Sequence, residues 1–284
     1  MILSRSECPL CAGTVSQLWM DQSKPTHYNR CRSCGTVYAS PYAPPEERFA
    51  WLDEHFSAGD LAEQNAAYRQ PALAVEAELI KHHKTTGRLL DIGCNLGDFF
   101  AGFPDPAWQR FGVELSPSAA AHAAKTYQAE VFVGQLQEAA YPSAAFDLVT
   151  MIDMFYYLDD PVSDLHEVGR IVKPDGLLAL EITGQRYQFL RSRGPLCWLA
   201  EKRWTRLDSA SPYLHWPSPQ GMQRVLERAG LRVIAWYPVP HITSGNAIIR
   251  FALSRYYSFF KAANRHPSRL SYVPKYLCLA QPFH

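Results

Sequence analysis

The sequence predicts an α/β protein built on a doubly wound, mostly parallel sheet of seven strands, preceded by a small cysteine-rich module. From Gly87 onward, short apolar runs alternate with helical stretches, a pattern typical of parallel strands whose connecting helices cover both faces of a sheet. Two C-x-x-C pairs precede this region. A chain of 284 residues is long enough for one such domain and one appended module.

Composition divides the chain into three regions. Residues 1–40 contain both cysteine pairs but few aliphatic side chains, so they need a cross-link or a bound metal in place of a hydrophobic core. A proline cluster then opens a helical linker over residues 41–85, and the main domain covers residues 86–284. Within the main domain we expect a basic insertion over residues 184–216 and a helical insertion over residues 246–273, before the last strand.

The elements of the main domain follow in order. The runs GRLLDIG, RFGVEL, EVFVG, FDLVTMID and GLLALEI predict five strands, with helices after the first run, in SPSAAAHAAKTY and through HEVGRIV. A further helix in PSPQGMQRVLERAG ends at Gly230, which suits a helix C-cap, and LRVIAWYPV predicts the sixth strand. The amphipathic stretch AIIRFALSRYYSFFKAANR is expected to pack between the sixth strand and the last, YLCLAQ.

Composition also excludes several classes of protein. Apolar residues make up 47% of the chain and charged residues 19%, which is not the usage of a disordered protein. No apolar run approaches the roughly 18 residues that cross a bilayer, and the start lacks the hydrophobic stretch of a signal peptide, so we expect a cytoplasmic protein without a transmembrane segment. Seven cysteines, four of them in tight pairs, favour reduced thiols and a metal over a secreted disulfide framework.

Charge is strongly segregated along the chain. Residues 41–183 carry nine Lys and Arg against 22 Asp and Glu, whereas residues 184–284 carry fifteen against three. The basic third either meets an anionic group of a substrate or neutralises the acidic region beneath it. Both interpretations are open from the sequence.

The four paired cysteines predict a structural zinc site. The pairs are separated by 19 residues, close to the spacing that lets four thiolates close a tetrahedral shell. Gly35 supplies backbone freedom directly after the second pair. Four protein ligands leave no open position on the ion, so we expect a structural role, and the alternative is two pairs of buried thiols without metal. The predicted ligands are Cys8, Cys11, Cys31 and Cys34.

The first strand of the main domain leads into a glycine-bearing turn. LLDIGCNLG places an acidic residue at the end of a strand and two glycines in the turn after it, and Glu114 ends the next strand, 23 residues beyond Asp91. A carboxylate at that position can accept hydrogen bonds from both hydroxyls of a ribose. A nicotinamide site would need G-x-G-x-x-G, but Asn95 and Asp98 stand where the second and third glycines belong.

Residues 87–183 resemble a class I S-adenosylmethionine-dependent methyltransferase domain, whose fold is Rossmann-like. LLDIGCNLGDFF resembles the first motif of that family, FDLVTMIDMFYYLDDP its fourth-strand motif, and HEVGRIVKPDGLLALEI the segment into the fifth strand. The resemblance implies that S-adenosylmethionine is the cofactor. It implies a cofactor site formed by Asp91, Gly93, Cys94 and Gly97 near the methionine part, Glu114 at the ribose, Leu115 at the adenine, and Asp153 in the cleft where the methyl group moves. Many relatives hold the adenine amine with an acidic residue after the third strand, where this chain offers Gln135 and Gln137, and a glutamine can still accept that hydrogen bond.

An oxygen acceptor needs a base, for which we expect a histidine. Relatives with a Glu-His pair after the fourth strand have Tyr156 and Tyr157 at the matching positions here, so the base must come from elsewhere. His215 and His241 follow later elements near the open ends of the strands, and His215 is the first choice. The alternative for either histidine is a packing or surface role.

The arginines of the basic insertion predict a phosphate-bearing acceptor. Six basic side chains and three tryptophans lie in or beside this insertion, namely Arg186, Arg191, Arg193, Lys202, Arg203, Arg206, Trp198, Trp204 and Trp216. Such a set suits a nucleotide-linked sugar or polysaccharide precursor, and the arrangement resembles methyltransferases of sugar, polysaccharide and natural-product pathways. Two alternatives stay open: an RNA methyltransferase that grips RNA with the zinc module and basic tail, and a non-catalytic module that docks a partner or an anionic membrane. A DNA substrate is not expected.

Overall fold

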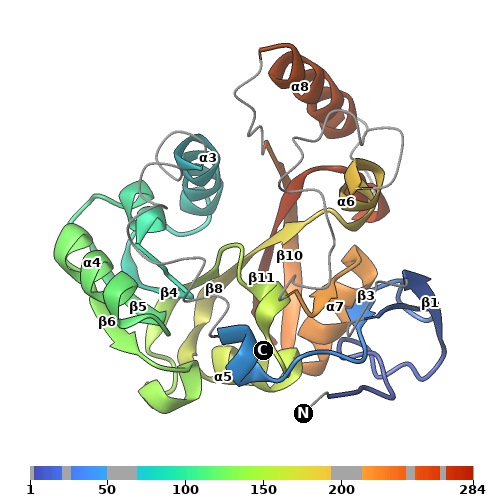
Figure 1. The fold of residues 1–284 in the computed structure, drawn as a ribbon. Coiled ribbons are helices and arrows are strands. Elements are labelled where there is room, and N and C mark those ends of the chain that lie inside the picture. The colour runs from blue at the N-terminus through green and yellow to red at the C-terminus, as the bar shows by residue number, and fades with distance from the viewer. Residues whose placement is uncertain are drawn as a thin grey trace.

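The computed structural model describes residues 3–20, 27–49, 69–192, 213–240, 247–262 and 267–283. Two sheets organise these residues: a seven-stranded sheet at the centre and a four-stranded sheet beside it (Figure 1). Short helices cover the faces of the larger sheet. Of the part of the chain that is described, no helix is long and apolar enough to cross a membrane.

The central sheet has the order β10-β11-β8-β7-β4-β5-β6. Neighbouring strands from β8 to β6 are parallel, and β11 is antiparallel to both of its neighbours. This confirms the predicted mostly parallel, seven-stranded Rossmann-like sheet. The strands are β4 (Gly87–Ile92), β5 (Trp108–Glu114), β6 (Glu130–Val133), β7 (Phe146–Met151), β8 (Val172–Thr183), β10 (Leu231–Val239) and β11 (Lys275–Pro282).

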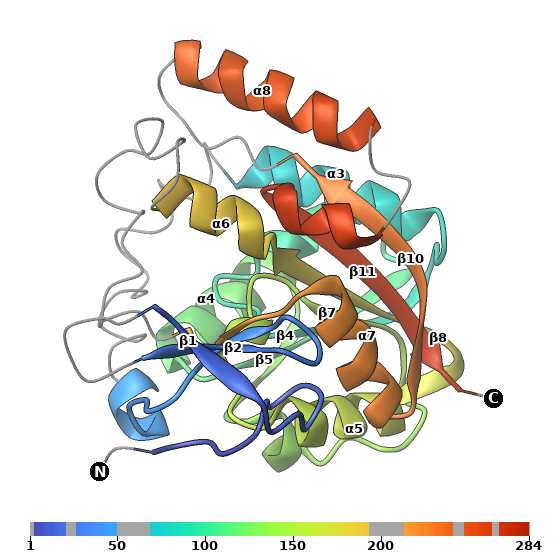
Figure 2. The same cartoon turned by 90° about the vertical axis from the view of Figure 1, so that its right-hand side faces the viewer.

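Helices pack on both faces of the central sheet because consecutive strand residues point in opposite directions. Leu89 belongs to one apolar cluster with α3, η1 and α4, whereas Leu90 belongs to another with α5 and α7. Figure 2 shows α5 and α7 on the near face of the sheet, with α4 behind it. The helices are α3 (Gln70–Lys81), η1 (Asp98–Gly102), α4 (Pro117–Tyr127), η2 (Leu136–Ala139), η3 (Phe155–Tyr157), α5 (Pro161–Ile171), α6 (Gln185–Ser192), α7 (Pro219–Arg228), α8 (Ala247–Ala262) and η5 (Pro267–Tyr272).

The element after β4 is shorter than the sequence indicated. A full helix was expected, but η1 is a five-residue 3-10 helix that ends at Gly102. Phe103 precedes a proline, and the residue before a proline is disfavoured in helical conformation. The short element leaves room for α3, whose Ala77 approaches so closely that a Cβ on Gly102 would lie 2.4 Å from the Ala77 Cβ.

The small sheet joins the N-terminal module to the main domain. Its order is β1-β2-β3-β9, with every pair antiparallel. The last strand comes from residues 215–216, which the sequence assigned to the end of the basic insertion, so the module is completed by a segment nearly 180 residues away. The strands are β1 (Ser16–Met20), β2 (Tyr28–Cys31), β3 (Val37–Ala39) and β9 (His215–Trp216).

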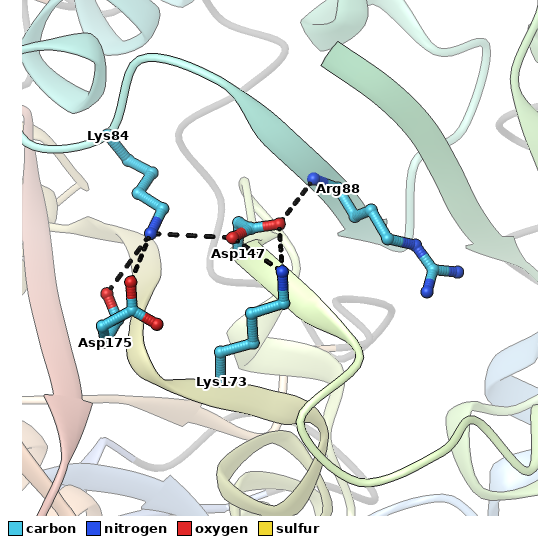
Figure 3. Close-up of polar contacts among 5 residues, drawn as sticks. All are labelled: Lys84, Arg88, Asp147, Lys173 and Asp175. Atoms are coloured by element: carbon cyan, nitrogen blue, oxygen red, sulfur yellow. Dashed lines mark hydrogen bonds and ion pairs between the residues drawn. The ribbon is translucent and has the colours of Figure 1, made fainter. Parts of the chain in front are cut away.

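Asp147 ties together the amino ends of three parallel strands. Its carboxylate accepts a hydrogen bond from the Arg88 backbone N–H at 2.9 Å and lies 2.9 Å from the Lys173 ammonium at both oxygens (Figure 3). Lys84 lies 3.6 Å away and also pairs with the exposed Asp175. Burial alone would raise the pKa of Asp147, but these hydrogen bonds and charges outweigh it and hold the pKa below its usual value.

We expect Asp147→Asn to lower the free energy of unfolding by about 2 kcal/mol at pH 7, because charge-assisted hydrogen bonds are lost. Since the folded-state pKa of Asp147 is depressed, this stabilisation is complete above the unfolded pKa, near 3.9, and is lost as the pH falls through the folded pKa. Urea titrations of wild type and variant should therefore differ at pH 7 and converge in acid. Asp175→Asn, at a side chain that is 78% exposed, is the matched control and should change stability by less than about 0.5 kcal/mol. A difference for Asp147→Asn that is independent of pH would contradict the account.

Candidate functional site

A tight turn after β4 forms the centre of the candidate site. Gly93 and Gly97 both have positive φ, at 71° and 81°, and Asn95 between them has a φ of 49°. Side-chain-bearing residues rarely adopt this conformation, which explains the two glycines. A Cβ on Gly93 would also lie 2.6 Å from Cγ of Met154, so the turn packs directly against the segment that follows β7.

Glu114 holds this turn from the neighbouring strand. One carboxylate oxygen accepts a hydrogen bond from the Asn95 backbone N–H at 2.8 Å, and the other accepts one from the Ser116 backbone N–H at 2.9 Å. The side chain is half-buried at the carboxyl end of β5. Ligands of α/β sheets bind at the carboxyl ends of the strands, so Glu114 lies where a ribose would meet it.

Asp91 is buried under the turn. The Thr150 hydroxyl donates a hydrogen bond to its Oδ1 at 2.6 Å, across the β4–β7 pair. Burial raises the pKa of Asp91 to about 7, although the Thr150 hydrogen bond and the charge of Arg69 act in the opposite direction. The Asp91 carboxyl group thus links β4 to β7, and with so little exposed surface it offers a bound ligand only a small polar contact.

The remaining predicted cofactor residues surround the turn. Cys94 is buried, and its Sγ lies 2.7 Å from where a Cβ on Gly112 would stand, so a glycine is needed in β5. Leu115 is exposed directly after β5. Gln135 is exposed after β6, with its backbone N–H bonded to Glu138. Both exposed side chains stand at the same edge of the sheet as Glu114, as an adenine-binding role requires.

Asp153 lies beside the turn within a cluster of charged groups. Its backbone has a φ of 59°, and its side chain is 30% exposed. The Lys275 ammonium lies 2.9 Å from its Oδ2, and Arg69 lies 3.8 Å from the same oxygen. Lys275 also lies 2.9 Å from Oε1 of Glu181. Two cations thus bracket Asp153, and the buried Lys275 links it to β8.

Glu76 of α3 completes this cluster from the face of the sheet. It is fully buried, and neither of its carboxyl oxygens has a hydrogen-bond partner among the described residues. Burial and the negative charge of Glu181 raise the pKa of Glu76 well above its usual value, a direction that favours the uncharged carboxyl group. Burial alone would lower the pKa of Lys275, but the charges of Asp153 and Glu181 outweigh it and hold that pKa above its usual value. The ion pairs of the cluster join two carboxylates, Asp153 and Glu181, to two cations, Arg69 and Lys275.

Three tyrosines border the charged cluster. The Tyr213 ring centre lies 5.2 Å from that of Tyr156 and 5.3 Å from that of Tyr157. The Tyr156 hydroxyl accepts a hydrogen bond from the Thr183 backbone N–H, so it is fixed to the carboxyl end of β8. Tyr157 and Tyr213 remain partly exposed. Together they give the site an aromatic wall on the side away from Glu114.

His215 does not fit the predicted role of a base. It is fully buried in β9, its Nε2 donates to the Phe155 carbonyl at 2.9 Å, and burial lowers its pKa to about 3. An imidazole with no exposed surface cannot take a proton from a bound acceptor. His215 is a packing residue instead: it belongs to β9 of the small sheet, and its ring centre lies 5.3 Å from that of Phe155 in η3. His241, the second candidate, lies outside the described residues.

Most of the basic insertion, residues 193–212, lies outside the described part of the chain. Arg193, Lys202, Arg203, Arg206, Trp198 and Trp204 lie outside the described residues, and the backbone of Arg191 is described without its side chain. Arg186 is placed: its guanidinium lies over the Tyr272 ring and donates to the Tyr272 hydroxyl. Trp216 is buried in β9. A phosphate-binding role for this insertion therefore stays a prediction.

The four predicted zinc ligands come together. The Sγ atoms of Cys8, Cys11, Cys31 and Cys34 all lie within 4.8 Å of one another. The Cys8–Cys34 and Cys11–Cys31 sulfurs are 3.7 and 3.6 Å apart, too far for a disulfide and close to the ~3.8 Å edge of a tetrahedron with Zn–S bonds of about 2.3 Å. The donor set therefore fits a zinc ion.

Hydrogen bonds connect the cysteine cluster to the aromatic wall through residues 214–218. Ser218, at the start of α7, donates its hydroxyl to the Cys34 carbonyl. Gln185 donates to the Gly35 carbonyl at 2.9 Å and to the Trp216 carbonyl at 3.1 Å. The Leu214 backbone N–H then bonds the Tyr156 carbonyl at 2.8 Å. The four-cysteine cluster thus supports the segment that carries Tyr213.

Sequence reasoning missed four members of the charged cluster. Arg69, Glu76, Glu181 and Lys275 come from separate elements, and no local motif joins them. Two carry a signal in retrospect: Glu181 interrupts the apolar run LLALEI, and Glu76 occupies a core position of α3 between Leu73 and Ile80. A charged residue at a core position marks either a buried pair or a site.

Comparison with known proteins identifies the family. A sequence profile described as a methyltransferase domain matches residues 62–235, which include the turn, Glu114 and Asp153. The chain belongs to this methyltransferase family. The match ends within β10 and excludes the cysteine module.

The relatives agree on the family and on the fold. The methyltransferase shares 30% identity with an uncharacterized methyltransferase of Schizosaccharomyces pombe over 39% of this chain, and the match spans only 44% of that protein. It shares 27% identity with a probable methyltransferase, LtbC, of Aspergillus luteorubrus over 68% of this chain and 72% of that protein. The Burkholderia thailandensis 1,6-didemethyltoxoflavin N1-methyltransferase superposes with a TM-score of 0.56 at 14% identity, covering 92% of this chain and 100% of that one. This structural likeness shows the class I fold.

Proposed function

We propose that the protein transfers a methyl group from S-adenosylmethionine to a small acceptor. The observation that carries this proposal is the pairing of the left-handed turn at Gly93–Gly97 with the Glu114 carboxylate at the carboxyl edge of a parallel sheet. Glycines let the cofactor approach the backbone, and Glu114 accepts hydrogen bonds from its ribose. The B. thailandensis protein of the same fold was solved with S-adenosylhomocysteine bound, which supports the choice of cofactor.

The other proposed cofactor contacts come from residues at or just after the carboxyl ends of β4, β5 and β6. Leu115 would pack on the adenine, Gln135 would accept a hydrogen bond from its amine, and Gly97 and Cys94 would line the methionine part, with the buried Asp91 at the end of β4. When bound, S-adenosylmethionine supplies a methyl group on a sulfonium, which reacts by in-line displacement. The chain's own task is then to hold donor and acceptor collinear and to exclude water.

The acceptor stands between Asp153 and the tyrosine wall, with oxygen as the atom methylated. The Asp153 carboxylate would accept the proton of the acceptor hydroxyl and become a neutral carboxyl group. Lys275 and Arg69 fix the Asp153 carboxylate, and Tyr157 and Tyr213 contact the ring that bears the hydroxyl. A phosphate carried by the acceptor, as on a nucleotide-linked sugar, would be met by arginines of residues 184–216.

The zinc ion has a structural role in this proposal. Cys8, Cys11, Cys31 and Cys34 would hold it with no position open for a substrate. Zinc would fix the knuckle that supports residues 214–218 and, through them, the tyrosine wall.

Turnover of an Asp153→Asn variant tests the acceptor side. We expect release of S-adenosylhomocysteine, measured with panels of hydroxylated aromatics, nucleotide sugars and transfer RNA, to slow at least about 100-fold in the variant because the proton acceptor is lost. Cofactor affinity should stay within about threefold of wild type. Asp175→Asn, at the opposite edge of the sheet, is the control and should leave turnover unchanged. Turnover of Asp153→Asn close to the wild-type rate would contradict this role, and turnover with RNA alone would favour the RNA alternative.

A further inference from the structure

Helix α8 lies at the same edge of the sheet as the candidate site but outside both layers. It follows β10, which runs parallel to β8, so it begins beyond the carboxyl end of that strand. Two tyrosines attach it: the Tyr257 hydroxyl donates to the Pro238 carbonyl at 3.0 Å, and the Tyr256 hydroxyl donates to the Tyr272 carbonyl at 2.7 Å. Both views place α8 at the periphery (Figures 1 and 2). The helix was expected to pack between the sixth strand and the last, and it does so only through the side that carries Tyr256 and Tyr257.

The outward side of α8 carries an exposed aromatic stripe. Phe251 and Phe259 are 69% and 67% exposed, larger fractions than for any other large apolar side chain among the described residues. Arg255 and Ser258 between them are exposed as well. These four residues are spaced by four, three and one, so they lie on one side of the helix, whereas Tyr257 on the opposite side is buried.

All Asp, Glu, Lys and Arg residues in the C-terminal segment that contains α8 are basic. Residues 228–284 contain no Asp or Glu, so no carboxylate of this segment offsets its positive charge. The segment's basic residues are Arg228, Arg232, Arg250, Arg255, Lys261, Arg265, Arg269 and Lys275. Of these, Arg228 and Arg232 stand near the amino end of β10, at the opposite end of that strand from α8. Lys275 is paired with Asp153 and Glu181, and Arg255 stands in the aromatic stripe itself.

We propose that α8 docks the protein on the surface of an anionic lipid bilayer, with Phe251 and Phe259 inserted among the headgroups. The aromatic side chains would insert at the boundary between headgroups and acyl chains, and the arginine would pair with the negative headgroups. A helix side that projects outward suits a broad, deformable surface better than a preformed protein groove. A second copy of this chain is disfavoured as the occupant, because two stripes carrying Arg255 would repel each other.

Docking by α8 would bring the carboxyl edge of the sheet toward the bilayer. The stripe and the Asp153 cluster lie at the same edge, since Lys275 follows η5, which contacts α8 through Tyr256. An amphiphilic acceptor lying in the membrane surface would then reach the site without passing through bulk water. The docking itself does not depend on methyl transfer.

Sedimentation with vesicles tests this proposal on the full-length protein. We expect binding to vesicles of phosphatidylcholine mixed with phosphatidylglycerol, weakening as salt is raised, and little binding to phosphatidylcholine alone. Phe251→Gln and Arg255→Glu should each lower the partition coefficient at least about fivefold. Val15→Gln, at a 53% exposed apolar residue of the cysteine module, is the matched control and should bind like wild type. Circular dichroism and a cooperative thermal transition show that the variants are folded.

Three results would overturn the proposal. They are absence of binding to anionic vesicles, equal binding to both vesicle types, and binding that survives both α8 substitutions in folded protein. Retention of wild type on transfer RNA but not on vesicles, lost in Arg255→Glu, would assign the basic surface to RNA instead. Vesicle binding by a protein that fails to bind S-adenosylhomocysteine would leave docking intact and refute only the proposed function.

Discussion

Glu114→Ala is expected to lower the affinity for S-adenosylhomocysteine by roughly 150-fold, about 3 kcal/mol. The proposed ribose contact consists of two hydrogen bonds to a carboxylate, and the substitution removes both. It also removes the acceptor for the Asn95 and Ser116 backbone N–H groups, so the turn loses its support from β5. Both effects act in the same direction, and calorimetric titration of wild type and variant measures their sum.

A control separates this effect from a general loss of charge. Glu130 stands at the other end of the neighbouring strand β6, where it is exposed. Glu130→Ala should bind S-adenosylhomocysteine within twofold of wild type, roughly the scatter of such a measurement. If Glu114→Ala also binds as wild type does, the ribose is held elsewhere and the assignment of the carboxyl edge of β5 fails.

Loss of one zinc ligand is expected to undo the module and its support of the tyrosine wall. Cys34→Ser should lower bound zinc from about one equivalent to a small fraction, because a structural site depends on all four thiolates. Since Ser218 bonds the Cys34 carbonyl and Leu214 bonds Tyr156, the amide of Leu214 should exchange with solvent at least about tenfold faster. Metal analysis and hydrogen exchange measure these two effects, and chelation of the wild type should reproduce the second.

Cys278→Ala is the matched control for the zinc prediction. Its thiol is buried in β11, away from the four-cysteine cluster. The variant should keep about one equivalent of zinc even where it loses some stability. Wild-type protein that purifies with neither zinc nor iron near one equivalent would refute the metal site itself.

Local patterns were sufficient to predict most of the fold. Continuous apolar runs such as LLALEI predicted the succession of strands β4 to β8 along the chain. Gly230 was expected as the C-cap of α7, but the C-cap is Ala229, and Gly230 follows it with a φ of 76°, as a glycine just beyond a helix end often does. The same approach failed where distant contacts decide the outcome. A full helix was expected where η1 forms, because the close approach of α3 at Gly102 is not visible in a local window.

The candidate site divides in the same way. The proposed cofactor side consists of one turn and the end of the next strand, both close in sequence, so the placement of Gly93 and Glu114 beside each other could be predicted. The acceptor side is assembled from β7, β8, β11 and the start of α3, and Lys275 reaches Asp153 across more than 120 residues. His215 was misassigned for the related reason that β9 pairs with β3, which buries it.

Calorimetric titration of zinc-loaded wild-type protein with S-adenosylmethionine and S-adenosylhomocysteine tests the central claim most directly. Saturable binding of both ligands near one per chain, in the micromolar range or on the order of −8 kcal/mol, with no heat from NAD, is the result predicted by a turn that lacks G-x-G-x-x-G and a carboxylate at Glu114. No binding of either ligand to folded protein would contradict the assignment of this edge of the sheet as a methyl-donor site.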